Sequence, residues 1–193
     1  MQNSMKLCKP FQTASRNSIS QGFGVNPCSY QPNGHSGNDF VNPTGTWLVA
    51  PELCKVVNII DTPQKLDTDL APLERGYGIV MQSLAKANTY YLYWHCLPFF
   101  PVEIGDTVTQ CQEVARMGNS GFCIVRGEVV PLDIRNVPPY LGTHLHYEKF
   151  TEENGVRKYY DVLPDIDWTI WNSNGVLDDI QKVLQKILNI FKK

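Results

Sequence analysis

The sequence lacks a run of the roughly 20 apolar residues that a membrane-spanning helix needs, and residues 1–10 lack the apolar stretch of a signal peptide. It also lacks a basic excess, because 17 Lys and Arg face 19 Asp and Glu, for a formal net charge of -2. A general nucleic-acid-binding surface normally needs such an excess. We therefore expect no transmembrane segment, no nucleic-acid partner and no export through a signal peptide.

The cysteines are numerous for a cytosolic protein, yet none of them forms a CxxC pair. They could form as many as three disulfides outside the cell, or stay buried as small apolar thiols. Because no oxidising export route is visible in the sequence, we favour thiols, although the pattern leaves the redox state open. The six residues are Cys8, Cys28, Cys54, Cys96, Cys111 and Cys123.

Short runs rich in Val, Ile, Tyr and Trp dominate the chain and predict strands. The 14 Gly and 13 Pro add many turn signals, and a hydrophobic content of 42% suits a folded protein. We expect a mainly β fold, built as a compact antiparallel sheet with long loops. The predicted strands cover residues 46–50, 54–60, 77–84, 89–96, 105–108, 112–117, 143–150 and 157–162.

Three segments interrupt this pattern. Residues 61–75 and Phe122–Leu141 are proline-containing stretches that we interpret as long surface loops. Val176–Phe191 has apolar residues at helical spacing, which predicts a C-terminal amphipathic helix. Its apolar stripe could pack on the sheet domain, bind a partner protein or touch a membrane. We expect an N-terminal extension over residues 1–20, one main domain over 21–162 and a C-terminal extension over 163–193.

Only four histidines are present, and all lie in motifs that could serve one site. His144 and His146 flank Leu145 in a predicted strand, so their side chains should project from the same face. His35 and Asp39 are four residues apart in a segment whose Pro and Gly content favours a loop. His95 ends a predicted strand, where alternation places it on the face of the neighbouring tyrosines. Each motif alone is common in proteins without a metal, but together they leave no histidine unused.

Two histidines and an aspartate form a mixed nitrogen and oxygen donor set that suits zinc. Such a set leaves a fourth coordination position for water, whose pKa can fall from about 15.7 to near 7. A closed set of four protein ligands would instead stabilise the fold. The donor set therefore favours a hydrolase.

The order of these motifs resembles that of the lysostaphin/LytM-type zinc peptidases, over about residues 21–148. The matching segments are Gln21-Gly22-Phe23-Gly24, His35-x-Gly37-x-Asp39, Gly76-Tyr77-Gly78, Tyr93-x-His95-x-Leu97, Gly105-Asp106-x-Val108, Gln112, Gly118-Asn119-Ser120-Gly121 and His144-Leu145-His146-Tyr147-Glu148.

The resemblance implies an antiparallel β-sheet peptidase domain with its site in a groove. It also implies that His35, Asp39 and His146 bind one zinc ion, and that His95 and His144 are catalytic residues beside it. These two would orient or deprotonate water, stabilise the oxyanion and protonate the leaving amine. Which of them does which is left open. The implied substrate is a peptide of bacterial peptidoglycan.

Two departures from the family pattern stand out. Cys54 and Cys111 occupy positions where the family usually has glycine. The stretch between Gly121 and His144 is much longer than the family's link, and because it leads into the His144–His146 strand it could rim the groove and select substrate. A surface loop without such a role is the alternative.

We therefore expect a zinc endopeptidase of the cell wall, from a phage, released by lysis or carried on a virion. Two alternatives remain open. One is a wall-lysing amidohydrolase that uses a cysteine such as Cys28 with a histidine. The other is a non-catalytic structural module of a phage particle.

Overall fold

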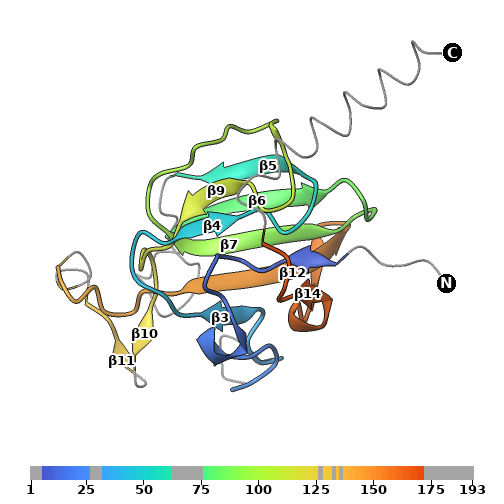
Figure 1. Ribbon diagram of the computed structural model, residues 1–193. Coiled ribbons are helices and arrows are strands. Elements are labelled where there is room, and N and C mark those ends of the chain that lie inside the picture. The colour runs from blue at the N-terminus through green and yellow to red at the C-terminus, as the bar shows by residue number, and fades with distance from the viewer. Residues whose placement is uncertain are drawn as a thin grey trace, which may run out of the picture.

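The computed structural model describes residues 6–26, 32–61, 76–125, 128–131, 134 and 137–171. Its main element is an eight-stranded antiparallel sheet in the order β2-β3-β12-β7-β6-β5-β8, with β13 also paired to β12 (Figure 1). The expectation of a mainly β, antiparallel fold is confirmed. The strands are β2 (Ile19–Gln21), β3 (Asn38–Phe40), β5 (Cys54–Ile60), β6 (Tyr77–Ser83), β7 (Tyr90–Cys96), β8 (Thr107–Val108), β12 (Leu145–Glu153) and β13 (Val156–Tyr160).

Three further strand pairs surround this sheet. They are β4 (Trp47–Val49) with β9 (Glu113–Arg116), β10 (Ile124–Val125) with β11 (Glu128–Val129), and β1 (Leu7–Cys8) with β14 (Ile166–Asp167). The last pair is parallel and joins the two ends of the described chain. Two 3-10 turns, η1 (Arg16–Ser18) and η2 (Leu163–Asp165), complete the elements.

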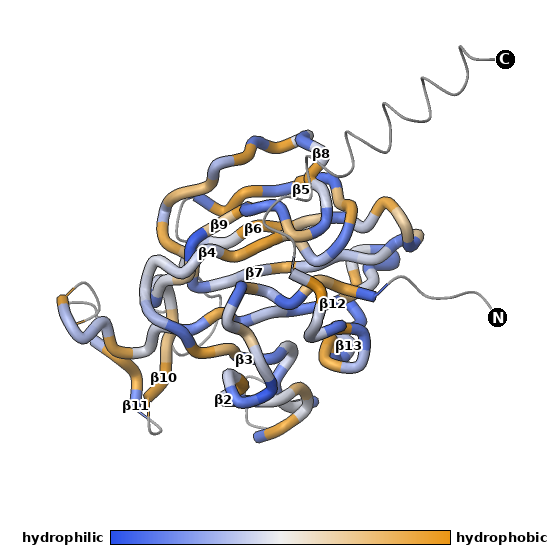
Figure 2. Tube along the Cα trace, in the orientation of Figure 1, coloured by the Kyte–Doolittle hydropathy of each residue, from blue (hydrophilic) through white to orange (hydrophobic). Residues whose placement is uncertain are grey.

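The core lies between the main sheet and the β4–β9 pair. Tyr93 and Tyr147 are fully buried there, with ring centroids 4.8 Å apart, and the Tyr93 hydroxyl donates to the Val49 carbonyl at 2.8 Å. Since side chains alternate along a strand, burying Tyr147 turns its neighbour His146 to the opposite face of β12. Figure 2 shows apolar stretches along β5 and β6 and a separate apolar stretch on the β10–β11 arm.

One disulfide corrects the expectation of thiols. Cys8 and Cys111 are bonded, with Cα atoms 5.8 Å apart and a sequence separation of 103. The bond ties the N-terminal segment to the turn between β8 and β9. Cys54 and Cys96 are buried thiols, as expected for small apolar residues.

Several predictions lie outside the described residues. They concern the helix over Val176–Phe191, Cys28 and most of the loop over residues 61–75. Among the described residues, no helix is long and apolar enough to cross a membrane.

Candidate metal centre

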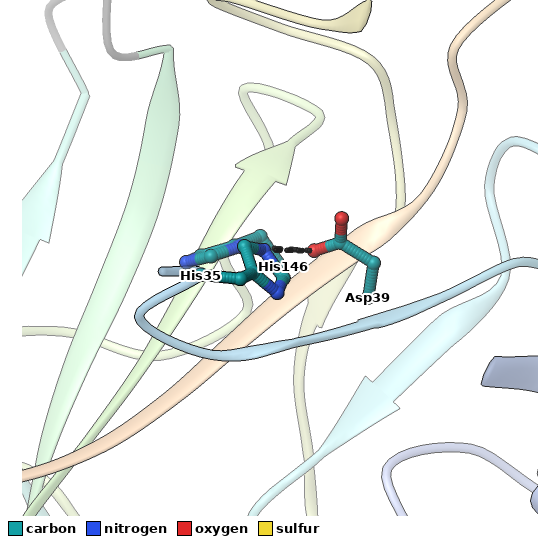
Figure 3. Close-up of side chains that lie close together, drawn as sticks. All are labelled: His35, Asp39 and His146. Carbon is teal, nitrogen blue, oxygen red and sulfur yellow. Dashed lines mark hydrogen bonds and ion pairs between the residues drawn. The ribbon is translucent and has the colours of Figure 1, made fainter. Parts of the chain in front are cut away.

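Three side chains from two separate parts of the chain meet at one point. Asp39 lies in β3, directly opposite His146 in β12, and His35 lies in the turn before β3. Asp39 Oδ1 is 2.9 Å from His146 Nδ1 and 3.2 Å from His35 Nε2, and the two ring nitrogens are 2.9 Å apart (Figure 3). The prediction of a loop is confirmed for His35, but it is wrong for Asp39, which lies in the short strand β3.

The far sides of both imidazole rings are fixed by acceptors. His35 Nδ1 lies 3.1 Å from the Gly22 carbonyl oxygen, and His146 Nε2 lies 3.1 Å from Glu148 Oε1. A carbonyl and a carboxylate oxygen can only accept, so these two ring nitrogens carry the protons. The other two nitrogens then direct lone pairs at the carboxylate of Asp39. Three electron-rich atoms at this separation need a cation or a proton between them.

The spacing of the three atoms suits a tetrahedral ion. With bonds of about 2.0 to 2.1 Å, two ligands of tetrahedral zinc are about 3.3 Å apart. The observed separations of 2.9, 3.2 and 2.9 Å are slightly tighter, so small outward movements would admit the ion. These are also the three residues whose donor atoms lie close enough together to share one ion among the described His, Cys, Asp and Glu residues.

Electrostatics around the cluster favour positive charge. Burial opposes ionisation of Asp39, but its hydrogen bonds to His146 and His35 outweigh burial and hold its pKa well below the usual range. Burial alone would lower the pKa of His146, yet hydrogen bonds to Asp39 and Glu148 raise that pKa to about 10. Without a metal ion, the cluster therefore holds a proton at neutral pH. A divalent cation could take the place of this proton.

His144 and His95 lie beside the cluster. His144 Nε2 is 3.9 Å from Asp39 Oδ1, and the His144 and His95 rings are 4.4 Å apart between centroids. Each ring donates through Nδ1 to a backbone carbonyl oxygen, His144 to Gly142 at 2.7 Å and His95 to Ser120 at 2.6 Å. Their Nε2 atoms therefore carry lone pairs.

Both of these histidines are neutral at physiological pH. Burial and the neighbouring His144 lower the pKa of His95 well below its usual value. Burial also lowers the pKa of His144, although the Asp39 carboxylate opposes that shift. A neutral imidazole whose Nδ1 is committed to a carbonyl can accept a proton at Nε2. The structure thus brings all five expected residues together, as a three-residue cluster and an adjacent pair.

No protein-family model matches the sequence, and a search of curated proteins finds no match. Solved structures do match. The catalytic domain of the antimicrobial peptidase lysostaphin from Staphylococcus simulans is 20% identical, with a TM-score of 0.50, over 73% of this chain and 86% of that one. A variant of the catalytic domain of EnpA, a prophage-encoded M23 protein from Enterococcus faecalis, is 21% identical, with a TM-score of 0.51, over 79% of this chain and 94% of that one. A zinc-containing peptidase from Vibrio cholerae is 20% identical, with a TM-score of 0.50, over 80% of this chain and 39% of that one.

This chain has the lysostaphin/LytM-type peptidase fold. At sequence identities of 20% and 21%, the similarity to these structures is a similarity of fold. Within the lysostaphin/LytM-type fold, Cys111 stands at a position where the resemblance leads one to expect glycine, and its backbone φ of 63° is the left-handed conformation that glycine adopts readily. The disulfide to Cys8 therefore lies at a strained turn.

A β-bulge sets the position of His95 in this lysostaphin/LytM-type sheet. The pairing of β6 with β7 shifts between Tyr77 and Gly78, and His95 falls in the extra position with a φ of 62°. Regular alternation would have placed His95 with Tyr93 in the core. That expectation is wrong, because the bulge turns the imidazole towards His144 and His146. Left-handed backbone in a non-glycine residue is costly and often marks a functional position.

Two polar residues were missed as members of the site. Ser36 donates its hydroxyl to Glu148 Oε1 at 2.6 Å, and the same carboxylate oxygen accepts from His146. Glu148 thereby joins the loop that carries His35 to the strand that carries His146. Gly37 permits this contact, since a Cβ there would come within 2.5 Å of the Tyr147 carbonyl oxygen. The sequence signal that could have identified Glu148 is its position two residues after His146, which places both side chains on the same face of the strand.

Proposed function

We propose that this protein is a zinc-dependent endopeptidase that hydrolyses peptide bonds in bacterial peptidoglycan. The observation that carries the proposal is the convergence of three lone-pair donors, from His35, Asp39 and His146, beside two neutral histidines. A purely structural metal site would have no need of this second pair.

His35 Nε2, Asp39 Oδ1 and His146 Nδ1 would hold the ion. Their side chains are 5%, 13% and 10% exposed, so the donors lie just below the surface, where substrate can approach. Zinc in an open site of three protein ligands acts as a Lewis acid and makes water a stronger acid. The hydrogen bonds to Gly22 and Glu148 keep both imidazoles in the tautomer that binding requires.

His95 and His144 would move the proton. As neutral bases, either can take a proton from the attacking water through Nε2 and return it to the amine that leaves when the C–N bond breaks. The other can donate a hydrogen bond to the oxyanion through Nε2 once it is protonated. His95 and His144 each donate through Nδ1 to one backbone carbonyl oxygen, so their hydrogen bonds do not distinguish the general base from the residue that stabilises the oxyanion.

The choice of substrate rests on the resemblance to lysostaphin/LytM-type peptidases and on the fold shared with an antimicrobial peptidase. A phage origin, with release by lysis or carriage on a virion, is a finer proposal that accords with the fold shared with a prophage-encoded protein. The division into residues 1–20, 21–162 and 163–193 stays a prediction.

The cysteine alternative finds little support among the described thiols. Burial raises the pKa of Cys54 to about 12 and also raises that of Cys96, which leaves both as thiols rather than thiolate nucleophiles. Cys123 Sγ lies 3.6 Å from His95 Nδ1, but that nitrogen donates to the Ser120 carbonyl oxygen at 2.6 Å and is not available to take the thiol proton. A non-catalytic module is disfavoured because the histidines are placed for proton transfer as well as for binding.

Incubation with purified cell walls tests the proposal. Zinc-loaded protein should release peptide fragments whose masses identify the bond cut, a chelator should abolish release, and added zinc should restore it. A thiol alkylator should have no effect. Full activity in metal-free protein, or loss of activity to the alkylator alone, would contradict the proposal.

A further inference from the structure

Ser120 makes three hydrogen bonds at the β-bulge that turns His95 out of the core. Its hydroxyl accepts from the Tyr77 backbone N–H at 2.9 Å and donates to the Cys96 carbonyl oxygen at 2.7 Å. Its own carbonyl oxygen accepts from His95 Nδ1 at 2.6 Å. Tyr77 and Cys96 face each other across β6 and β7. The hydroxyl therefore bridges the backbones of two directly opposed residues, while the carbonyl of the same serine binds the imidazole.

The bridge lies where the regular pairing of these strands breaks. The pairing shifts next to Tyr77 and leaves His95 as the extra residue, with a backbone φ of 62°. This conformation is costly for a residue other than glycine, so it persists only where the surroundings hold it. The two bonds of the Ser120 hydroxyl secure the strand on each side of the break, and so they hold the bulge in place.

The backbone of Ser120 is itself fixed on two sides. Gly76, with a φ of 80°, packs so tightly against it that a Cβ there would lie 2.5 Å from the Ser120 carbonyl oxygen. Gly118, two residues before Ser120, accepts from the His144 backbone N–H at 3.2 Å. The carbonyl that binds His95 thus belongs to a segment anchored to the strands around the site. Loss of the hydroxyl would free the bulge to move away from that carbonyl.

We propose that the Ser120 hydroxyl is a positioning group that keeps His95 in the tautomer with its proton on Nδ1. The proposal rests on the endopeptidase function proposed above, in which either role of His95 uses Nε2. Without the hydroxyl, the Tyr77 N–H and the Cys96 carbonyl lose their shared partner, and a direct bond between the strands would flatten the bulge. An imidazole withdrawn from the Ser120 carbonyl can carry its proton on Nε2, where it no longer accepts one.

Zinc-loaded Ser120→Ala protein tests this role by kinetics. With a soluble wall peptide that the wild type cuts, we expect kcat to fall by about 10- to 100-fold and KM to stay within about threefold. Zinc content should not change, because Ser120 has no hydrogen bond to His35, Asp39 or His146 among the described residues. Ser120→Thr keeps a hydroxyl at this position and should retain most of the wild-type kcat.

Imidazole nitrogen NMR of isotopically labelled protein measures the tautomer itself, independently of activity. The His95 signals are those that vanish in His95→Ala. They should show a protonated Nδ1 and an unprotonated Nε2 in the wild type and in Ser120→Thr. In Ser120→Ala the two nitrogen shifts should converge or exchange, because the proton is no longer confined to Nδ1. Ser120→Cys fills the same space with a weak hydrogen-bonding group and replaces the alanine variant should that protein not fold.

Ser83→Ala is the matched control. Ser83 is a buried serine at the other end of β6, where its hydroxyl accepts from the Lys86 backbone N–H at 2.8 Å. The variant removes a comparable hydrogen bond far from His95, and it should keep the wild-type kcat and His95 signals. An equal loss of kcat in Ser83→Ala would mark the effect as general destabilisation and overturn the positioning role.

The role of Ser120 also fails if folded, zinc-loaded Ser120→Ala keeps kcat within twofold of the wild type, or keeps the wild-type His95 tautomer. Failure of Ser120→Thr to preserve both measurements would equally contradict it. If the wild type cuts neither walls nor peptides, the endopeptidase function fails, whereas the nitrogen signals still decide whether the hydroxyl sets the tautomer of His95.

Discussion

Replacing Glu148 by alanine would remove the acceptor that fixes His146. In the folded protein, Glu148 Oε1 accepts from His146 Nε2 at 3.1 Å and from the Ser36 hydroxyl at 2.6 Å. Its side chain is only 8% exposed, so water would replace these bonds poorly. Without the carboxylate, His146 loses the partner that selects its tautomer and ring orientation. We expect Glu148→Ala to weaken zinc binding although Glu148 does not touch the ion.

The expected loss of zinc affinity can be estimated from other residues that orient a metal-binding histidine without touching the ion. Removing a group that orients a metal-binding histidine typically costs 10- to 100-fold in metal affinity, which is about 1.4 to 2.7 kcal/mol. The stranded His146 N–H and Ser36 hydroxyl would each add about 1 to 3 kcal/mol of lost folding stability if water does not reach them. Glu148→Gln keeps an oxygen acceptor in the same place and should retain most of the affinity.

Competition with a chromophoric zinc chelator measures this affinity directly, without reference to activity. Circular dichroism of the same samples checks that each variant is folded. Glu152→Ala is the matched control, because Glu152 lies on the same strand and pairs with Arg157 at the surface, at 2.8 Å. A folded Glu148→Ala protein that binds zinc within twofold of the wild type would refute the reasoning.

The remaining predictions concern the ligands, the pH dependence and the disulfide. His146→Ala should lose both zinc and activity, whereas His95→Ala should lose activity and keep zinc; equal metal loss in both, by elemental analysis, would overturn the division of roles. Zinc affinity should fall by up to about tenfold per pH unit as the pH drops below about 10. The reason is that a proton on His146 competes with the ion, and the pKa of His146 without metal is raised to about 10. A flat affinity profile between pH 6 and 9 in chelator titrations would contradict this. Cys8→Ser should lower the free energy of unfolding by about 2 to 5 kcal/mol in urea titrations, since the bond to Cys111 closes a loop over 103 positions, and zinc content should not change.

Sequence periodicity predicted the parts of the fold that follow regular alternation. The strand-rich runs correspond to β4, β5, β6, β7, β8, β9, β12 and β13, and His144 and His146 share a face as expected. The Pro and Gly content around His35 predicts a loop there, and the three residues of β3 carry too little apolar alternation to override that signal. Asp39 nevertheless lies in β3.

Other features depend on geometry that a sequence does not display. His95 looked like a regular strand residue, and only the β-bulge turns it into the site. The Cys8–Cys111 bond joins distant positions and could not be deduced from spacing. The link from Ser36 to Glu148 depends on the close approach of two segments at Gly37.

Anomalous scattering at the zinc edge, from crystals of the zinc-loaded protein, tests the central claim most directly. The account predicts one strong peak per chain, about 2.0 to 2.2 Å from His35 Nε2, Asp39 Oδ1 and His146 Nδ1, with a fourth position occupied by solvent. A peak elsewhere, or a fourth protein ligand filling that position, would contradict it.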